Sequence, residues 1–225
     1  GNMSRSIIAG LIQAGYPAER ITAANPSRPK LDELADQFGI RITQNNAEAA
    51  READVIVLAV KPQLMAAMLE ALVAELGSLE GKLLVSIAAG IKVERLQEMA
   101  GGHARIIRTM PNTPSLLGLG MTGLYAPTGI EQADRDFAEQ MMQAVGKTLW
   151  VAQESGINGV IAAAGSAPAY FFLFMQGIAE EAEAMGFSPE QARLLVQQTA
   201  LGAAAMVEQN PELSLQALRE HFTPR

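Results

Sequence analysis

Four loops of this sequence hold the polar and small residues that chemistry can use. They read NPSRP (25–29), KPQ (61–63), AAG (88–90) and PNTP (111–114), and each follows an aliphatic run typical of a strand. In an open parallel sheet, ligands bind beyond the carboxyl ends of the strands, where such loops gather. One such loop is typical of an ordinary turn, but four in succession predict a shared ligand site.

The side chains of these loops favour a nucleotide ligand. Ser27 and Arg28 provide a hydroxyl and a forked cation, which suit the 2′-phosphate of NADP, whereas NAD sites usually carry an acidic residue at this place. Lys61 puts a positive charge at a strand end, where a phosphate or a substrate carboxylate is attracted. The stretch 88–90 has no side-chain bulk, so a flat ring can lie against its backbone.

A fifth candidate lies in AAAGSAPAYFF (162–172). We expect Gly165 to break one helix, Ser166 to cap the next, and Pro168 to lie near its first turn. Free N–H groups and the positive dipole end of a helix attract carboxylates, so this helix start is a candidate anion site. Any capped helix start has the same pattern, so an ordinary helix start without a ligand remains the alternative.

Composition excludes several classes of protein. The chain has 225 residues, 49% hydrophobic and 18% charged, which is enough for a substantial core. The formal charge of −7 argues against a nucleic-acid or anionic-membrane partner. The chain has no cysteine and two distant histidines, His103 and His221, so we expect no thiol chemistry and no metal site. We see no membrane-length apolar run and no signal peptide, and expect a cytoplasmic protein.

The elements that must position these loops alternate between strand and helix. We expect strands at 21–24, 40–43, 55–60, 82–88, 104–110, 121–126 and 148–152, and helices at 3–15, 29–39, 46–52, 63–76, 92–99 and 131–144. This alternation predicts an α/β fold with a mostly parallel, Rossmann-type sheet over residues 1–152. The aliphatic run 55–60 is typical of a strand buried on both faces. No strand precedes the first helix, so we expect the first strand of the sheet to be missing from this sequence.

Residues 153–225 predict a second, all-α domain. Helices are expected at 154–163, 168–185, 189–208 and 213–221. Apolar residues occupy every face of the run 170–175, and a helix of this kind must be covered on all sides. About 70 residues cannot do this alone, so we expect a second subunit to cover it. Packing against the first domain is the alternative.

Taken together, these motifs resemble a known enzyme family. GNM followed by IIAGLIQAG, then AVKP, AAG, MPNTP and GSAPAYFF, in this order and spacing, are similar to pyrroline-5-carboxylate reductases over essentially the whole chain. The resemblance implies a dinucleotide-binding domain followed by a helical domain that forms a homodimer, or a higher homo-oligomer. It also implies hydride transfer from NADPH, or NADH, to the ring C=N of 1-pyrroline-5-carboxylate, which gives L-proline in the last step of proline biosynthesis.

The resemblance also assigns site residues by position. Glu154 matches an acidic residue near the ring nitrogen of the substrate, and Ser166 lies in the substrate region. The expected cofactor residues are Gly1, Asn2, Met3, Ser27, Arg28, Asn46, Ala59, Val60, Lys61, Pro62, Ala88, Ala89, Gly90, Asn112, Thr113 and His221. An imine protonates more readily than a carbonyl, so orientation and charge placement can replace a strong general acid.

This sequence departs from the family pattern at two places. Ala164 and Ala167 replace a serine and a glycine of the family's Ser-Gly-Ser-Gly-Pro-Ala-Tyr motif, and a methyl at residue 167 narrows the expected carboxylate pocket. The family also continues beyond the equivalent of 218–223 with a substrate-binding loop, whereas this sequence ends at Arg225. A catalytically silent NADP-binding or sensor protein of the same fold is therefore one alternative.

A related NADP-dependent hydroxyacid dehydrogenase is the other alternative. Those enzymes use a lysine of the helical domain as proton donor. Residues 152–225 contain no lysine, which argues strongly against this activity.

Overall fold

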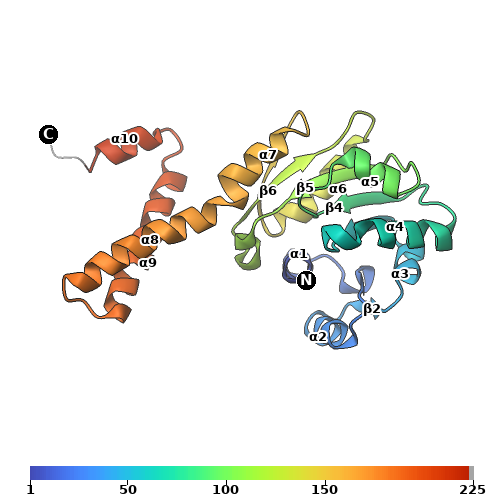
Figure 1. The fold of residues 1–225 in the computed structure, drawn as a ribbon, viewed down its shortest axis with the longest axis horizontal. Coiled ribbons are helices and arrows are strands. Elements are labelled where there is room, and N and C mark those ends of the chain that lie inside the picture. Colours follow the sequence, from blue (N-terminus) through green and yellow to red (C-terminus); the bar gives the residue numbers. More distant parts are fainter. Residues whose placement is uncertain (223–225) are drawn as a thin grey trace. The chain divides into compact units, whose positions relative to one another are not determined.

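A computed structural model describes residues 1–222 of the chain, which divides into two compact units (Figure 1). Unit 1 is Gly1–Ser166, and unit 2 begins at Ala167. The predicted boundary after residue 152 was drawn from a change in sequence pattern, and it stays a prediction.

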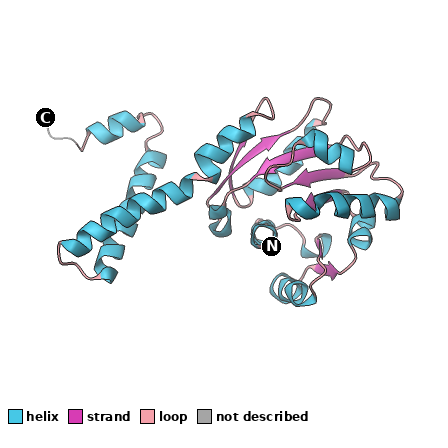
Figure 2. Ribbon diagram, viewed as in Figure 1, coloured by secondary structure: helices cyan, strands magenta, loops and turns pink. Residues whose placement is uncertain are grey.

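Helices and strands alternate through unit 1 (Figure 2). Its helices are α1 (Asn2–Gln13), α2 (Arg28–Phe38), α3 (Asn46–Glu52), α4 (Pro62–Leu76), α5 (Val93–Met99), α6 (Gln132–Gln143) and α7 (Gly156–Val160). Its strands are β1 (Thr22–Ala24), β2 (Arg41–Thr43), β3 (Val55–Leu58), β4 (Leu83–Ser86), β5 (Ile106–Met110), β6 (Gly120–Tyr125) and β7 (Gly146–Trp150). Two short 3₁₀ turns, η1 (Ala18–Arg20) and η2 (Thr113–Leu117), and a π-helical turn, η3 (Ile161–Gly165), complete the unit. The predicted elements are confirmed, with ends shifted by a few residues.

The strands form a five-stranded sheet in the order β3-β4-β5-β6-β7 and a separate pair, β1-β2. All neighbours are parallel except β5 and β6, which run antiparallel. A parallel connection needs a crossover of a dozen or more residues. The link between β5 and β6 contains only the short turn η2, so the chain reverses direction there. The predicted, mostly parallel sheet is confirmed.

Two apolar clusters lie on opposite faces of this sheet, because successive strand residues point to opposite sides. Leu84 and Ile106 belong to the cluster that includes α4 and α5. Val85 and Ile107, the next residues along, belong to the cluster that includes α1 and α6. Both faces of β4 and β5 are thus covered by packed apolar side chains.

The outer edge of β3 has no neighbouring strand among the described residues. Within residues 1–222, β3 pairs only with β4, and β1 pairs only with β2. β1 and β3 both line one cavity of about 960 Å³. Val57 is 36% exposed, so the prediction that 55–60 is buried on both faces is wrong. A strand between β1 and β3 would join the two sheets and cover Val57. The expected first strand has its place here, and it stays a prediction.

Unit 2 consists of helices, as predicted: α8 (Ala167–Ala184), α9 (Pro189–Gln209) and α10 (Leu215–Glu220). The start of α9 is set by a capping box. Ser188 Oγ accepts from the Gln191 N–H at 3.3 Å, and Gln191 Oε1 accepts from the Ser188 N–H at 2.9 Å. These two bonds satisfy donors that a helix start otherwise leaves free.

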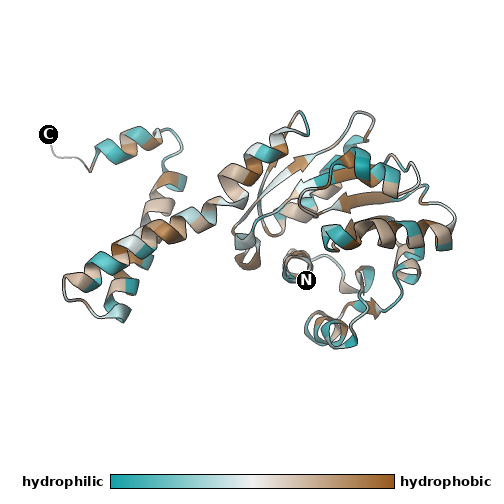
Figure 3. Cartoon of the chain, in the orientation of Figure 1, coloured by the Kyte–Doolittle hydropathy of each residue, from teal (hydrophilic) through white to brown (hydrophobic). Residues whose placement is uncertain are grey.

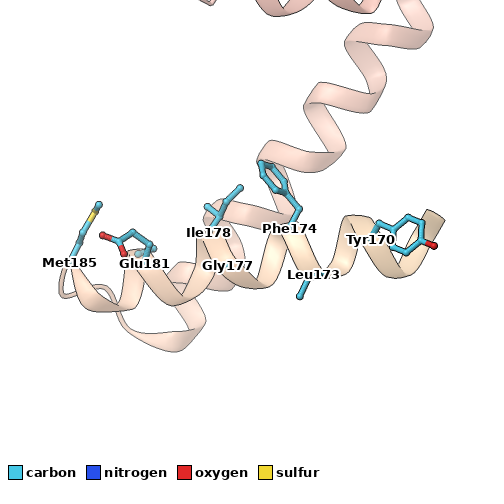
Figure 4. A pocket seen from close by; sticks show the side chains of 8 residues that line it. Tyr170, Leu173, Phe174, Gly177, Ile178, Glu181 and Met185 are labelled. Atoms are coloured by element: carbon cyan, nitrogen blue, oxygen red, sulfur yellow. The ribbon is translucent and has the colours of Figure 1, made fainter. Parts of the chain in front are cut away.

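No residue of α8 is buried within this chain, although apolar segments recur along the helix (Figure 3). One stripe of α8 lines a groove of about 680 Å³ (Figure 4). Its residues recur every three or four positions, from Tyr170 through Phe174 and Ile178, and Met185 just after the helix completes the lining. Phe174 is 72% exposed. A single chain therefore leaves uncovered the apolar run that the sequence predicts must be covered.

The helical segment Gly156–Ala184 is long and apolar enough to cross a membrane, judged by length and composition alone. The expectation that no such segment exists is therefore wrong. The sequence was expected to break the helix near Gly165. The π-helical turn Ile161–Gly165 instead connects α7 to α8, so the apolar residues on both sides belong to one long segment. One helix of this kind is weak evidence for a membrane span.

Candidate active site

The predicted loops follow β1, β3, β4 and β5. β3, β4 and β5 are neighbours and parallel, so their loops meet at the same edge of the sheet. The structure therefore brings the stretches 59–62, 88–90 and 112–113 to one edge. The loop at 25–28 follows β1, which belongs to the separate strand pair.

The start of α1 presents free backbone donors. Gly1 is the N-cap residue, and the first turn contains no acidic side chain. The Asn2 carbonyl accepts from Ser6 Oγ at 2.9 Å, and Met3 packs against the core, so both residues are held by the helix. The dipole of a 12-residue helix and its free N–H groups favour an anion at this end.

Four predicted cofactor residues line the cavity between β1 and β3. These are Gly1, Asn46, Ala59 and Val60. Lys30 also lines this cavity and adds a positive charge to it. Lys30 was not among the predicted cofactor residues, although its place two residues after Arg28 was a usable signal.

Ser27 and Arg28 lie at the start of α2. Ser27 is the N-cap residue, but its side chain makes no capping hydrogen bond. Arg28 Nε donates to Asp32 Oδ1 at 2.7 Å, and 60% of the Arg28 side chain is exposed. An exposed pair of this kind contributes about 0.3–0.5 kcal/mol. The guanidinium therefore remains available to an anionic ligand.

The loops after β3 and β4 differ in exposure. Lys61 is the exposed N-cap residue of α4, and Pro62 is its first residue. Ala88 is buried and its N–H donates to Ser86 Oγ at 3.3 Å, whereas the two residues that follow are exposed. Gly90 has φ +79°, a value that disfavours any side chain. The loop therefore presents bare backbone, as a stacked ring requires.

Asn112 joins two segments through its side chain. Its Nδ2 donates to the Ala164 carbonyl at 3.0 Å, and its Oδ1 accepts from the Met121 N–H at 2.8 Å. Asn112 is buried, whereas its neighbour Thr113 is exposed. Both ends of the amide are thus used within the protein. The geometry gives Asn112 a bridging role, and its predicted cofactor contact stays a prediction.

Ser166 does not cap a helix, so that part of the prediction is wrong. Its backbone is right-handed helical, and its N–H donates to the Ile161 carbonyl at 2.8 Å. This i→i−5 bond belongs to the π-helical turn, which carries the chain past Gly165 without a break. Such π-turns are frequent at functional sites. The role of Ser166 in the substrate region is not tested by this geometry.

Glu154 is held from two sides on the loop between β7 and α7. Its Oε1 accepts from the Val93 N–H at 2.8 Å and from Arg108 Nη1 at 2.9 Å. The Arg108 side chain is 5% exposed and that of Glu154 is 22% exposed. Arg108 was not among the predicted site residues, although the apolar run ARIIRTM, which contains Arg105 and Arg108, was a visible signal.

His221 ends α10 in unit 2. Its side chain is exposed, and its N–H donates to the Ala217 carbonyl at 3.2 Å. Its predicted cofactor contact stays a prediction. Within residues 1–222, no group of three or more His, Cys, Asp or Glu side chains is placed to hold a metal ion.

Comparison with known proteins identifies the family. Residues 1–90 match the family described as NADP oxidoreductase coenzyme F420-dependent, and residues 154–225 match pyrroline-5-carboxylate reductase dimerisation. The pyrroline-5-carboxylate reductase of Vibrio alginolyticus is 56% identical over 225 residues, which are 100% of this chain and 82% of that protein. The chain belongs to the pyrroline-5-carboxylate reductase family.

Solved structures of pyrroline-5-carboxylate reductases share this fold. That of Coxiella burnetii matches with a TM-score of 0.94 at 40% identity, covering 100% of this chain and 83% of that one. That of Plasmodium falciparum, with NADP bound, matches with a TM-score of 0.84 at 27% identity, covering 100% and 82%. The predicted combination of a Rossmann-type sheet and a helical dimerisation domain is confirmed.

Membership in this family also accounts for the bare apolar face of α8. The matched dimerisation region, 154–225, includes the whole helix. The chain is therefore built to form homo-oligomers, and the exposed stripe of α8 is a surface that such assembly can cover.

Proposed function

We propose that this chain reduces 1-pyrroline-5-carboxylate to L-proline, the last step of proline biosynthesis, with NADPH as the hydride donor. The 56% identity to a pyrroline-5-carboxylate reductase over all 225 residues carries this proposal. That similarity extends through both units of the chain. Glu154 and Ser166 are the proposed substrate-site residues.

The residues of the chain fit an NADP cofactor. At the end of β1, the hydroxyl of Ser27 and the cations Arg28 and Lys30 suit a 2′-phosphate. Asn25 stands where a ribose-binding carboxylate is usual, and its Nδ2 donates to the Ser27 carbonyl at 3.0 Å. The reductase of Plasmodium falciparum was solved with NADP bound. NADH is the weaker alternative, because no acidic residue lies between β1 and Asp32.

NADPH, when bound, supplies a hydride to the carbon of the ring C=N bond. The C=N electron pair then becomes the nitrogen lone pair, and the nitrogen keeps the proton that it gained beforehand. The task of the chain is to hold the protonated imine and to exclude wrong orientations. The Glu154 carboxylate stabilises the positive ring nitrogen, and the backbone at 88–90 leaves room for a flat ring against it.

Two further proposals concern the setting of this enzyme. The homo-oligomer is at least a dimer, supported by the match to a dimerisation family and by the bare face of α8. The enzyme acts in the cytoplasm, because burial between subunits explains the long apolar helix without membrane insertion. Fractionation of cells tests this location, and recovery of the protein with membranes after a salt wash would contradict it.

The proposed reaction is tested by following NADPH oxidation on addition of 1-pyrroline-5-carboxylate. We expect loss of NADPH absorbance and formation of L-proline in equal amounts. A parallel titration measures NADPH binding without substrate. Binding without substrate-dependent turnover would contradict the proposal and favour the catalytically silent NADP-binding protein.

A further inference from the structure

The loop after β1 borders the cavity between β1 and β3. Its residues Asn25 and Pro26 line this cavity, and Ser27 and Arg28 follow directly. The parallel pairing with β2 continues one residue into the loop, because the Asn25 N–H donates to the Thr43 carbonyl at 3.2 Å. Proline has no backbone N–H, so Pro26 cannot extend this pairing. Beyond Asn25, other bonds must hold the loop beside β2.

Gln44 provides such a bond. Its Nε2 donates to the Pro26 carbonyl at 2.9 Å, and Asn25 Nδ2 donates to the Ser27 carbonyl at 3.0 Å. Two successive carbonyls of the loop are thus held by side-chain amides. Gln44 follows directly after β2, and it is not among the residues of the described chain that line the cavity. It therefore supports the loop from outside the cavity.

The turn that carries Gln44 is itself held by hydrogen bonds. Thr43 is buried, and its Oγ1 accepts from the Asn45 N–H at 3.1 Å and donates to Glu48 Oε2. Asn45 Oδ1 accepts from the Ala47 N–H at 2.8 Å and from the Glu48 N–H at 3.1 Å, which caps α3. The Gln44 side chain therefore extends from a fixed turn to the loop after β1.

The same loop leads into the groups that suit a 2′-phosphate. Ser27 is the N-cap residue of α2, but the helix does not use its hydroxyl as a cap, and the Arg28 side chain is 60% exposed. We propose that Gln44 is a positioning residue that holds Ser27 and Arg28 at the 2′-phosphate, and so raises the preference for NADPH over NADH. The proposal rests on the cofactor part of the proposed function, which places the 2′-phosphate at this loop. NADH lacks this phosphate, so its binding does not depend on Gln44.

Cofactor titrations of the full chain test the proposal. Gln44→Met removes the donor and keeps a side chain of similar length. We expect it to raise the Kd for NADPH by about three- to tenfold and the Kd for NADH by less than about twofold. The kcat at saturating NADPH should stay unchanged, because only cofactor binding is affected. The double variant with Arg28→Ala should lose less than the product of the two single losses, because Gln44 acts in part through Arg28.

Gln97→Met is the matched control. Gln97 Nε2 also donates to a backbone carbonyl, that of Ala104, at 3.3 Å, and this bond is exposed like that of Gln44. Gln97 lies on α5 and is not among the described residues that line the cavity. We expect Gln97→Met to leave the Kd of both cofactors unchanged. Measuring Tm for both variants separates a loss of stability from a loss of cofactor selectivity.

The possible outcomes separate the two proposals. Equal Kd values for NADPH and NADH in the parent chain overturn the placement of the 2′-phosphate, and the role of Gln44 with it. A parent chain that prefers NADPH, together with a Gln44→Met variant that keeps this preference or loses both cofactors equally, overturns the role of Gln44 alone. Losses that multiply in the double variant do the same. The titrations need no substrate, so absent turnover contradicts the proposed reaction without affecting the role of Gln44.

Discussion

Asn112 donates its side-chain amide to the Ala164 carbonyl, 3.0 Å away, and thereby ties the loop after β5 to the π-helical turn. The same amide accepts from the Met121 N–H at the start of β6. One buried side chain thus connects the sheet to the turn that leads into Ser166. The two hydrogen bonds of Asn112 can be tested separately by substitution. The bond to Ala164 needs a donor at Nδ2, whereas the bond from Met121 needs an acceptor at Oδ1.

Asn112→Asp should disrupt the active site through the Nδ2 bond alone. The substitution keeps the acceptor for Met121 but sets a carboxylate oxygen against the Ala164 carbonyl. We expect a stability loss of about 1–3 kcal/mol and at least a tenfold loss of kcat/KM for 1-pyrroline-5-carboxylate. Asn210→Asp is the matched control, since Asn210 Nδ2 donates to the Met206 carbonyl at 2.7 Å from an exposed helix end. Equal losses in both variants would contradict the bridging role.

Arg28→Ala should weaken NADPH binding more than NADH binding. The guanidinium is exposed at the start of α2, and a charged hydrogen bond to a 2′-phosphate is worth about 1.5–3 kcal/mol, or roughly ten- to 150-fold in Kd. NADH lacks this phosphate and should lose little. Fluorescence titration with both cofactors measures the difference. Arg95→Ala is the control, because Arg95 forms a similarly exposed pair with Glu98. Equal losses for the two cofactors would exclude the phosphate contact.

Phe174→Glu should shift the chain toward monomers. Phe174 is 72% exposed in the single chain and lies in the apolar stripe of α8. A buried, unpaired carboxylate in an interface costs several kcal/mol. Sedimentation equilibrium measures the shift in molar mass. Gln176→Glu adds the same charge to the same helix at a polar position and should have less effect. An unchanged mass for Phe174→Glu would exclude this stripe from the interface.

Periodicity predicted the elements well because each has a clear apolar pattern and clear end signals. Gly39, for example, has a left-handed backbone at the end of α2, where the sequence indicated a helix stop. The helix break predicted at Gly165 is wrong, because glycine lowers helix propensity without removing a backbone donor. The chain continues through a π-helical turn, in which the Ser166 N–H donates to the Ile161 carbonyl, and no local sequence pattern reveals this turn.

Contacts between distant segments were the other limit of the sequence. Glu154 was singled out by resemblance, but its partners Arg108 and Val93 lie on β5 and α5. Pairing these residues requires the order and register of the strands, which propensity does not supply. The exposure of Val57 has the same origin, since burial of a strand depends on its neighbours as well as on its own residues.

The open edges of β1 and β3 should accept a parallel strand. Both edges border the same cavity, whose lining includes apolar side chains of α1 and α6 such as Ile8 and Phe137. An apolar segment of about six residues with a glycine-rich turn, placed ahead of Gly1, has the length of an average strand. It would pair with both edges and cover Val57.

We expect this extended chain to melt at a higher temperature and to bind NADPH more tightly, because the start of α1 would be fixed beside the cofactor site. Amide exchange at Val57 and Ala23 should slow, since their strands would no longer be edges. The control segment carries two prolines at alternate positions, which remove ladder donors while keeping the segment apolar. An equal rise in Tm with both segments would show that the added apolar residues stabilise the chain by filling the cavity, without pairing as a strand. Slower exchange with the first segment alone would establish strand pairing.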